Sequence, residues 1–185
     1  MLVTVDSVPG LIAAISLAVL FAIGGAQKWR SLGNFERTLQ AYELFPAALV
    51  RPVAIGVAAL EWLVAAGLLV SASRRGASLI GAGLLAAYAL AIGVNLRRGR
   101  RQIDCGCAGF GRRREISGSL VWRNVGLGAV LLAVGWLPWK SRDPGWIDIA
   151  TIAAGVCVAV LLYLSFDRLL GLSETESARA ARARA

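Results

Sequence analysis

The stretch ASLIGAGLLAAYALAIGVNL, Ala77–Leu96, contains no charged side chain. At about 1.5 Å of rise per residue, a helix of this length matches the roughly 30 Å thickness of the hydrocarbon core of a bilayer. The five residues that follow, RRGRR, end the apolar run abruptly. This stretch therefore predicts a membrane-spanning helix, and it decides the class of fold.

Further apolar segments of similar character lie on both sides of it, at residues 10–26, 50–70, 116–137 and 147–166. The whole chain of 185 residues is 57% hydrophobic, whereas soluble domains are about 45–50% apolar. The sequence predicts an all-α, polytopic transmembrane helix bundle. Its parts are a four-helix membrane domain over residues 8–137 and an additional transmembrane helix over residues 146–168.

Two segments differ from these spans. In residues 31–46, Leu32, Phe35, Leu39 and Tyr42 recur at helical spacing among polar residues. This pattern predicts an amphipathic interfacial helix that lies on the membrane surface or folds over the bundle. Residues 171–185 are polar and rich in alanine and arginine, which predicts a disordered cytoplasmic tail.

The net charge of +9 is carried mainly by arginines in the connectors between apolar runs. Membrane topology explains this distribution better than a nucleic-acid partner does, because basic residues gather on the cytoplasmic side. The motif Lys28-Trp29-Arg30 is interpreted as the interfacial stop of the first span. The charge count predicts a multi-pass protein of the bacterial inner membrane, with the N-terminus outside and the C-terminus inside.

The loop at residues 102–114 contains Cys105-Gly106-Cys107, flanked by arginines. A disulfide across one residue needs a tight bend that glycine permits, and such a strained bridge is readily reduced. Three alternatives remain: a redox-active dithiol, a soft-metal site with two thiolates, or a glycine-rich loop without chemistry. No metal ligand set is assigned. The chain has no histidine, which excludes catalytic triads with a histidine base and histidine-ligated haem.

Polar side chains also interrupt the predicted spans. An unpaired carboxylate near the middle of a bilayer is costly, so we expect Glu61 to pair with Arg123 of an antiparallel helix. With Asn95 and Asn124, these residues form either an intramembrane polar pocket beneath the cysteine loop or polar contacts between helices. Cys157, inside the fifth span, is expected to be an inert buried thiol.

Several stretches resemble the MauE family of methylamine-utilisation membrane proteins, which is related to DoxX-type proteins. They are Phe21–Trp29, Glu61, Asn95–Arg100, Ile103–Gly111 and Arg123-Asn124. The resemblance implies a four-helix membrane core and a role in maturation or export of the disulfide-rich small subunit of methylamine dehydrogenase. It implies Cys105 and Cys107 as site residues, with weaker support for Glu61, Asn95, Arg123 and Asn124.

We therefore expect thiol–disulfide exchange through Cys105 and Cys107, so the protein would be a thiol–disulfide oxidoreductase. The expected partners are the lipid bilayer, a thioredoxin-like redox protein and an exported disulfide-containing protein, with no nucleic acid. The sequence identifies no cofactor; a quinone is compatible with a membrane redox protein, but no motif supports one. The alternatives are a non-enzymatic scaffold or export partner and a small-solute transporter. The cysteine loop faces the cytoplasm or folds back into the bundle.

Overall fold

The computed structural model of the chain describes residues 6–100, 103, 116–138 and 145–182. Within these residues the chain forms six helices and no strand: α1 Ser7–Arg30, α2 Leu32–Tyr42, α3 Ala47–Leu69, α4 Arg74–Arg97, α5 Gly118–Trp136 and α6 Trp146–Arg182. All of them except α2 are long and apolar enough to cross a membrane. The predicted all-α bundle with five membrane spans is confirmed.

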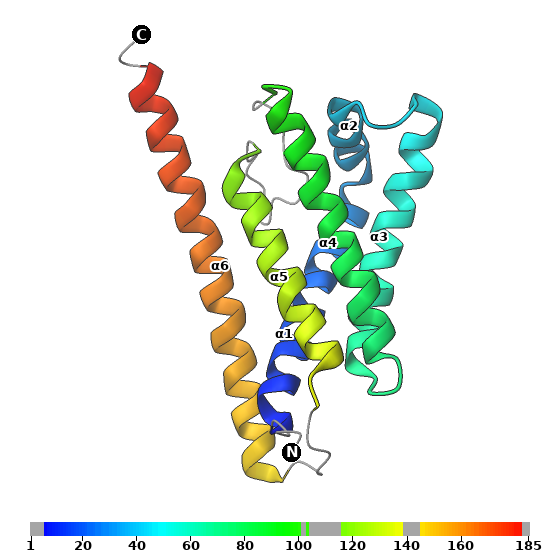
Figure 1. Cartoon of the computed structure of the whole chain (residues 1–185), viewed down its shortest axis with the longest axis vertical. Coiled ribbons are helices and arrows are strands. Elements are labelled where there is room, and N and C mark those ends of the chain that lie inside the picture. The colour runs from blue at the N-terminus through cyan, green and yellow to red at the C-terminus, as the bar shows by residue number, and fades with distance from the viewer. Residues whose placement is uncertain (1–5, 101–102, 104–115, 139–144, 183–185) are drawn as a thin grey trace.

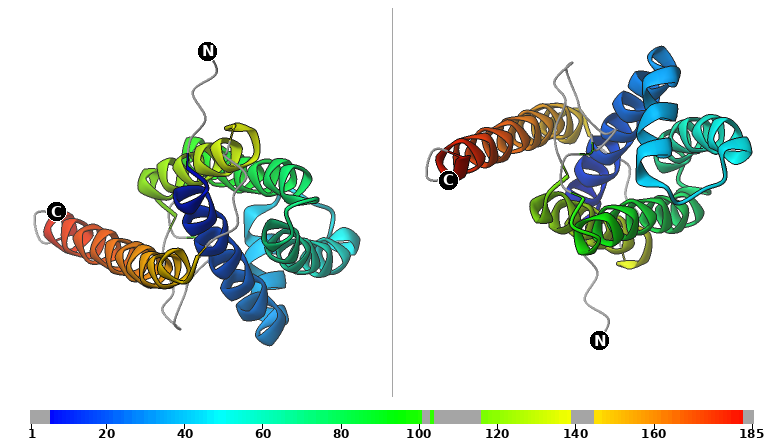
Figure 2. Two further views of the ribbon diagram at one scale, coloured as in Figure 1. Left: turned by 90° about the horizontal axis from the view of Figure 1, so that it is seen from below. Right: turned by 90° about the horizontal axis from the view of Figure 1, so that it is seen from above.

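The five long helices alternate in direction, so α1 begins and α6 ends at opposite ends of the bundle (Figure 1). Helix α1 packs along α3, α4 packs along α5, and α6 packs on α1. Seen along the bundle, α6 stands to one side of the other helices (Figure 2). The end of α1, the start of α3, the end of α4 and the start of α5 share one end of the bundle, and α2 covers part of it.

The C-terminal helix is longer than the sequence suggested. Residues 171–185 were predicted to be a disordered tail, but α6 continues as a helix to Arg182. Alanine, glutamate and arginine have high intrinsic helix propensity, and the segment 171–182 is rich in them. Its low hydrophobicity therefore indicates a helix that extends past the membrane rather than an irregular tail.

The larger hydrophobic core joins α1, α3, α4 and α5. Gly81 of α4 lies at its centre, where a β-carbon would stand 3.0 Å from Val64, 3.1 Å from Leu131 and 3.4 Å from Phe21. A side chain there would force these neighbours to move, and glycine lets three neighbouring helices approach α4. The buried members of this core are Ala14, Leu17, Ala18, Phe21, Val64, Ala65, Leu68, Ala77, Leu84, Leu85, Leu131 and Val134.

Helix α2 folds over the bundle, which is one of the two placements predicted for it. Phe35, Thr38 and Tyr42 form its buried face. Tyr42 belongs to a second, smaller hydrophobic cluster with Ile92, Ile116 and Leu120. This cluster ties α2 to the end of α4 and to the start of α5.

An exposed ion pair closes the same end of the molecule. Glu43, which follows α2 in the left-handed conformation at φ 49°, has its carboxylate 2.6 Å from the guanidinium of Arg100. The hydrogen bond from Arg100 lowers the pKa of Glu43; desolvation opposes this lowering, and the charges of Arg100 and Arg98 add to it. This pair joins the α2–α3 connection to the chain just after α4.

We expect Glu43 to titrate below the ordinary range of a glutamate, and Arg100→Gln to raise its pKa toward that range. Because the pKa is lowered in the folded protein, the contact stabilises the fold above the unfolded pKa and is lost as the pH falls through the folded pKa. The measurement is the ¹³C shift of the Glu43 carboxyl against pH. Arg98→Gln is the matched control and should move the pKa less; equal shifts in the two variants would contradict the assignment.

Candidate functional site

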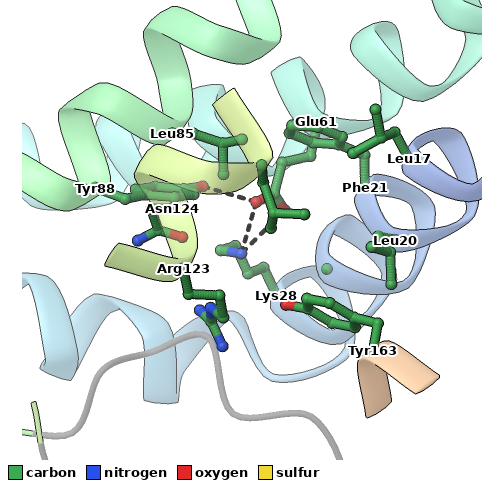
Figure 3. A pocket seen from close by; sticks show the side chains of 12 residues that line it. Leu17, Leu20, Phe21, Lys28, Glu61, Leu85, Tyr88, Arg123, Asn124 and Tyr163 are labelled. Carbon is green, nitrogen blue, oxygen red and sulfur yellow. Dashed lines mark hydrogen bonds and ion pairs between the residues drawn. The ribbon is translucent and has the colours of Figure 1, made fainter. Parts of the chain in front are cut away.

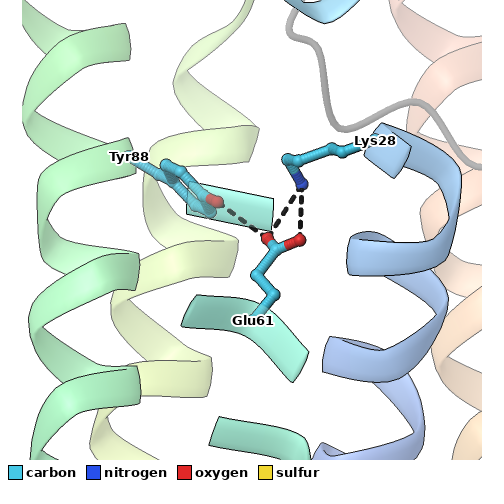
Figure 4. A network of polar contacts seen from close by, with 3 residues as sticks. All are labelled: Lys28, Glu61 and Tyr88. Atoms are coloured by element: carbon cyan, nitrogen blue, oxygen red, sulfur yellow. Dashed lines mark hydrogen bonds and ion pairs between the residues drawn. The ribbon is translucent and has the colours of Figure 1, made fainter. Parts of the chain in front are cut away.

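A buried charged network occupies the interior of the bundle (Figure 4). Glu61 lies in the second half of α3, and both of its carboxylate oxygens accept hydrogen bonds from the ammonium of Lys28, at 2.8 and 3.0 Å. The hydroxyl of Tyr88 donates to the same carboxylate at 2.7 Å. The side chains of Lys28 and Glu61 are each 4% exposed. Three helices, α1, α3 and α4, are thus joined through one carboxylate.

Lys28 differs from its predicted role. Its motif was interpreted as an interfacial stop, but only Trp29 and Arg30 are exposed, whereas Lys28 is buried. The reason is that α2 folds back over this end of α1. The Lys28 ammonium lies 5.3 Å from the ring centre of Phe35 in α2 and 5.4 Å from that of Tyr88, within cation–π range.

Two glycines make room for this network. A β-carbon on Gly24 would stand 3.2 Å from Glu61 Oε2, and one on Gly25 would stand 3.0 Å from the ring of Trp62 and 3.3 Å from the backbone oxygen of Ala58. Glycine at both positions allows α1 to approach α3 closely. The Gly24-Gly25 pair therefore sets the distance at which Lys28 can reach Glu61.

The predicted ion pair between Glu61 and Arg123 is wrong, because each of these residues pairs with another residue. Arg123 in α5 instead pairs with Asp167 in α6, at 2.7 Å. The carboxylate of Glu61 is already matched by Lys28, which lies on the neighbouring helix α1. Asp167 lies at the end of the predicted transmembrane helix 146–168, directly after its apolar run, so hydropathy gave no reason to expect it as a partner. In the structure α6 continues beyond it, and its carboxylate contacts Arg123 of α5.

A cavity of about 90 Å³ lies beside the network (Figure 3). One part of its lining is polar and the rest is apolar. Lys28, Glu61, Tyr88, Arg123, Asn124 and Tyr163 are polar, while Leu17, Leu20, Phe21, Gly24, Leu85 and Leu127 complete the wall. The sequence-predicted residues Glu61, Arg123 and Asn124 therefore line one space, together with residues that the sequence did not single out.

Asn124 has an unusual position in this lining. Its side chain is 2% exposed, and its amide nitrogen Nδ2 has no hydrogen-bond partner in the protein. Buried polar groups are nearly always hydrogen-bonded, and a donor left unmatched costs about 1–3 kcal/mol. The Asn124 side chain thus lines the cavity, while its amide nitrogen is buried without a partner in the protein.

Asn95 lies elsewhere. It does not line the cavity, and its amide nitrogen donates to the backbone oxygens of Ala91 at 3.1 Å and Tyr42 at 3.4 Å. It is fully buried beside the smaller cluster near the end of α4. Its contacts hold α2 against α4. Asn95 is therefore not part of the cavity that Glu61, Arg123 and Asn124 line.

Cys105 and Cys107 lie outside the described residues. The chain on either side of them is held together, because the backbone nitrogen of Ile116 donates to the oxygen of Ile103 at 3.0 Å. Both isoleucines contact the smaller hydrophobic cluster. The two ends of segment 104–115 therefore meet where α4 ends and α5 begins. Among the described residues, no three side chains of the metal-ligating types His, Cys, Asp and Glu come together.

Cys157 was expected to be buried, but it is exposed on α6. In the window that spans the membrane, none of the α6 residues is buried inside the bundle, because α6 packs mainly on α1. At that depth an exposed thiol faces lipid.

The network also contains residues that sequence reasoning missed. Lys28 follows Phe21 by seven residues, so the two lie on one face of α1, and Tyr88 is the one tyrosine in the span 77–96. Helical phase could have marked Lys28 as facing inward. Nothing in the sequence indicates that Asp167 meets α5 or that Tyr163 lines the cavity, since this depends on how α6 docks.

Comparison with known proteins gives a consistent result. The family described as "Methylamine utilisation protein MauE" matches residues 6–140. Over 156 residues the chain is 38% identical to the methylamine utilization protein MauE of Paracoccus versutus, covering 84% of each chain. Over 164 residues it is 34% identical to that of Paracoccus denitrificans, covering 89% of this chain and 88% of the relative. Over 176 residues it is 31% identical to that of Methylophilus methylotrophus, covering 92% and 90%. No solved structure matches the chain.

Proposed function

Because the chain belongs to the MauE family of methylamine utilisation proteins, we propose that it serves methylamine utilisation by thiol–disulfide exchange through Cys105 and Cys107. The chain is a multi-pass membrane protein with five helices able to span the bilayer. The finer role is the maturation or export of a disulfide-rich periplasmic protein such as the small subunit of methylamine dehydrogenase. The redox partner is a thioredoxin-like protein.

The observation that carries this proposal is the backbone hydrogen bond between the two residues that flank segment 104–115, which contains the cysteines. The bond between Ile116 and Ile103 brings together two positions that flank Cys105 and Cys107 in the chain. This bond holds both ends of segment 104–115, which contains the two cysteines in the chain, at the end of the bundle where α4 ends and α5 begins. Arginines on both sides of the pair favour the thiolate form, which is the nucleophile in exchange.

The chemistry is a two-step exchange. One thiolate attacks a sulfur of the partner's disulfide and forms a mixed disulfide, releasing one partner thiolate. The second cysteine then attacks the mixed disulfide, releases the other partner thiolate and leaves a Cys105–Cys107 bridge. Two electrons and two protons pass from the loop to the partner, and the reverse sequence returns them.

The orientation of the protein in the bacterial inner membrane follows from charge. Residues 97–101 and 112–114 supply seven of the arginines, and the chain leaves α4 and enters α5 at one end of the bundle. Basic residues are retained on the cytoplasmic side. We place the N-terminus outside, with the cysteine segment and the C-terminus on the cytoplasmic side.

The test is thiol labelling with a membrane-impermeant maleimide across a glutathione redox series. In inside-out vesicles we expect Cys105 and Cys107 to react with the maleimide at reducing potentials and to lose this reactivity together at oxidising potentials. In spheroplasts, where the reagent reaches only the outer face, we expect no labelling of either cysteine. A Cys157→Ser background removes the third thiol, and Cys105→Ser and Cys107→Ser should each abolish function and trap a mixed disulfide with a partner.

Two results would contradict the proposal. If both thiols stay reactive under fully oxidising conditions and the double serine variant still supports growth on methylamine, the cysteines are incidental. The protein is then a scaffold or export partner. Labelling from the outside would reverse the proposed orientation.

A further inference from the structure

We propose that the end of the bundle that α2 covers, the α2 end, is a docking surface for anionic phospholipid head groups and binds them in preference to zwitterionic ones. The proposal goes beyond thiol–disulfide exchange and does not involve the cysteine segment. It rests on three observations: the net charge of this end, the exposed arginines that no carboxylate neutralises, and the exposed apolar side chains next to them.

The charged side chains of residues 6–100 are divided unequally between the two ends of the bundle. Apart from the internal pair of Lys28 and Glu61, the α2 end carries six arginines and two glutamates, a net charge of +4 (Figure 1). The opposite end carries Arg74, Arg75 and Asp6, a net charge of +1. Clustered charge of one sign attracts the opposite sign, so the α2 end favours an anionic partner. Its arginines are Arg30, Arg37, Arg51, Arg97, Arg98 and Arg100.

The two glutamates of this end neutralise only part of that charge. Glu43 pairs with Arg100 at 2.6 Å, and Glu36 lies 3.8 Å from Arg51. The other four arginines are exposed and form no ion pair with any residue that the structure describes: Arg30, Arg37, Arg97 and Arg98. A guanidinium group binds phosphate through two parallel hydrogen bonds. These four side chains are therefore available for the phosphate of a lipid.

The four arginines lie on both sides of α2. Arg30 is the last residue of α1, which α2 follows directly, and Arg37 lies on α2 itself. Arg97 ends α4 and Arg98 follows it. The ion pair between Glu43 and Arg100 holds the end of α2 next to this part of the chain. The surface thus joins residues from three helices that the fold brings to one end.

Exposed apolar side chains next to these arginines fix the depth of the surface. Trp29 precedes Arg30 at the end of α1, and Phe45 and Leu49 precede Arg51 at the start of α3; all three apolar side chains are exposed. Both helices are able to span the bilayer, and aromatic and basic residues at the ends of spans lie at the level of the head groups. The surface is therefore held where phosphates and acyl chains meet.

A phospholipid matches both properties of this surface. Its phosphate suits the arginines, and its acyl chains cover Trp29, Phe45 and Leu49. An acidic protein would match the charge alone and would give no reason for apolar side chains to be exposed beside it. We therefore assign the surface to anionic lipid.

The test is a lipid titration of the purified full chain in dodecyl maltoside, an uncharged detergent. The probes are tritiated dioleoyl phosphatidylglycerol, which is anionic, and tritiated dioleoyl phosphatidylcholine, which has the same acyl chains and no net charge. We expect saturable binding of the anionic lipid and roughly tenfold weaker binding of the zwitterionic one. The difference should disappear at about 1 M salt, where the Debye length falls to about 3 Å.

Arg37→Gln is expected to weaken the binding of phosphatidylglycerol about fivefold, the effect of one arginine near an anionic lipid surface. Arg37→Lys keeps the charge and should retain most of the binding. The matched control is Arg75→Gln, which removes an arginine at the opposite end that is also exposed and without an ion pair among the described residues. It should bind as the wild type does. The double variant Arg97→Gln with Arg98→Gln tests the other side of α2 and should also weaken binding.

Three results would overturn the proposal. The first is equal binding of the two lipids. The second is equal affinity of Arg37→Gln and Arg75→Gln for phosphatidylglycerol, both measured on folded, monodisperse protein, since the α2 end would then not be the site. The third comes from a soluble polyglutamate peptide as a further probe: if it binds in an Arg37-dependent way and phosphatidylglycerol does not, the surface serves an acidic protein.

Discussion

Replacing Glu61 with glutamine is expected to destabilise the protein by about 3–5 kcal/mol, the usual cost of removing one partner of a buried ion pair. The change would leave the Lys28 ammonium, 4% exposed, without a negative charge at a depth that water reaches poorly. The measurement is the midpoint of thermal unfolding in detergent, followed by size-exclusion chromatography of the folded fraction.

The double variant Lys28→Met with Glu61→Gln should recover most of this loss, because it removes both charges. The glutamine oxygen can still accept the hydrogen bond from Tyr88. The exposed pair between Glu36 and Arg51, with 3.8 Å between charged atoms and Arg51 77% exposed, provides the control. Glu36→Gln should change stability little, as is usual for surface pairs. A Glu61→Gln variant as stable as the wild type would contradict the importance of the buried pair.

Gly81→Leu is expected to prevent accumulation of folded protein or to lower its unfolding midpoint strongly. The β-carbon alone would meet Val64 and Leu131 at about 3 Å, and the rest of the leucine would have to enter a core in which α1, α3 and α5 already meet α4. Overpacking usually costs about 1–3 kcal/mol where neighbours can move. Here the contacts come from three helices, so we expect a cost at or above that range.

Gly83 provides the matched control on the same helix. It is exposed, and a β-carbon there meets nothing within 4 Å. Gly83→Leu should therefore leave the folded yield unchanged or raise it, because it replaces glycine with a strong helix former on the lipid-facing side. Equal yields of the two variants would show that the close packing around Gly81 does not limit folding.

Hydrophobic length was enough to predict the membrane spans. The spans expected at residues 50–70 and 77–96 correspond to α3 Ala47–Leu69 and α4 Arg74–Arg97. The extra turn at each N-terminal end reflects the fact that a helix can extend into the interface, where hydropathy is no longer a guide. The same limitation explains why α6 continues to Arg182.

Partners within the membrane were harder to predict. The sequence correctly indicated that the charge of Glu61 requires compensation, but hydropathy treats Lys28 and Asp167 as span ends and so hides them as partners. Asn95 looked like a pocket residue because it lies in an apolar segment, yet it faces α2. Which face of each helix turns inward depends on how the helices dock. The spans are apolar all round and rich in small residues, so the sequence pattern indicates only weakly which face is buried.

The two internal ion pairs are completed at different stages of biosynthesis. Lys28 precedes Glu61 by 33 residues, so α3 enters the membrane with its partner already made. Arg123 precedes Asp167 by 44 residues, which the ribosome adds in roughly 2–9 s at about 5–20 residues per second. During that interval α5 holds an arginine whose carboxylate partner has not been synthesised. Because an unpaired charge in the bilayer is costly, we expect the insertion machinery to retain α5 until α6 emerges.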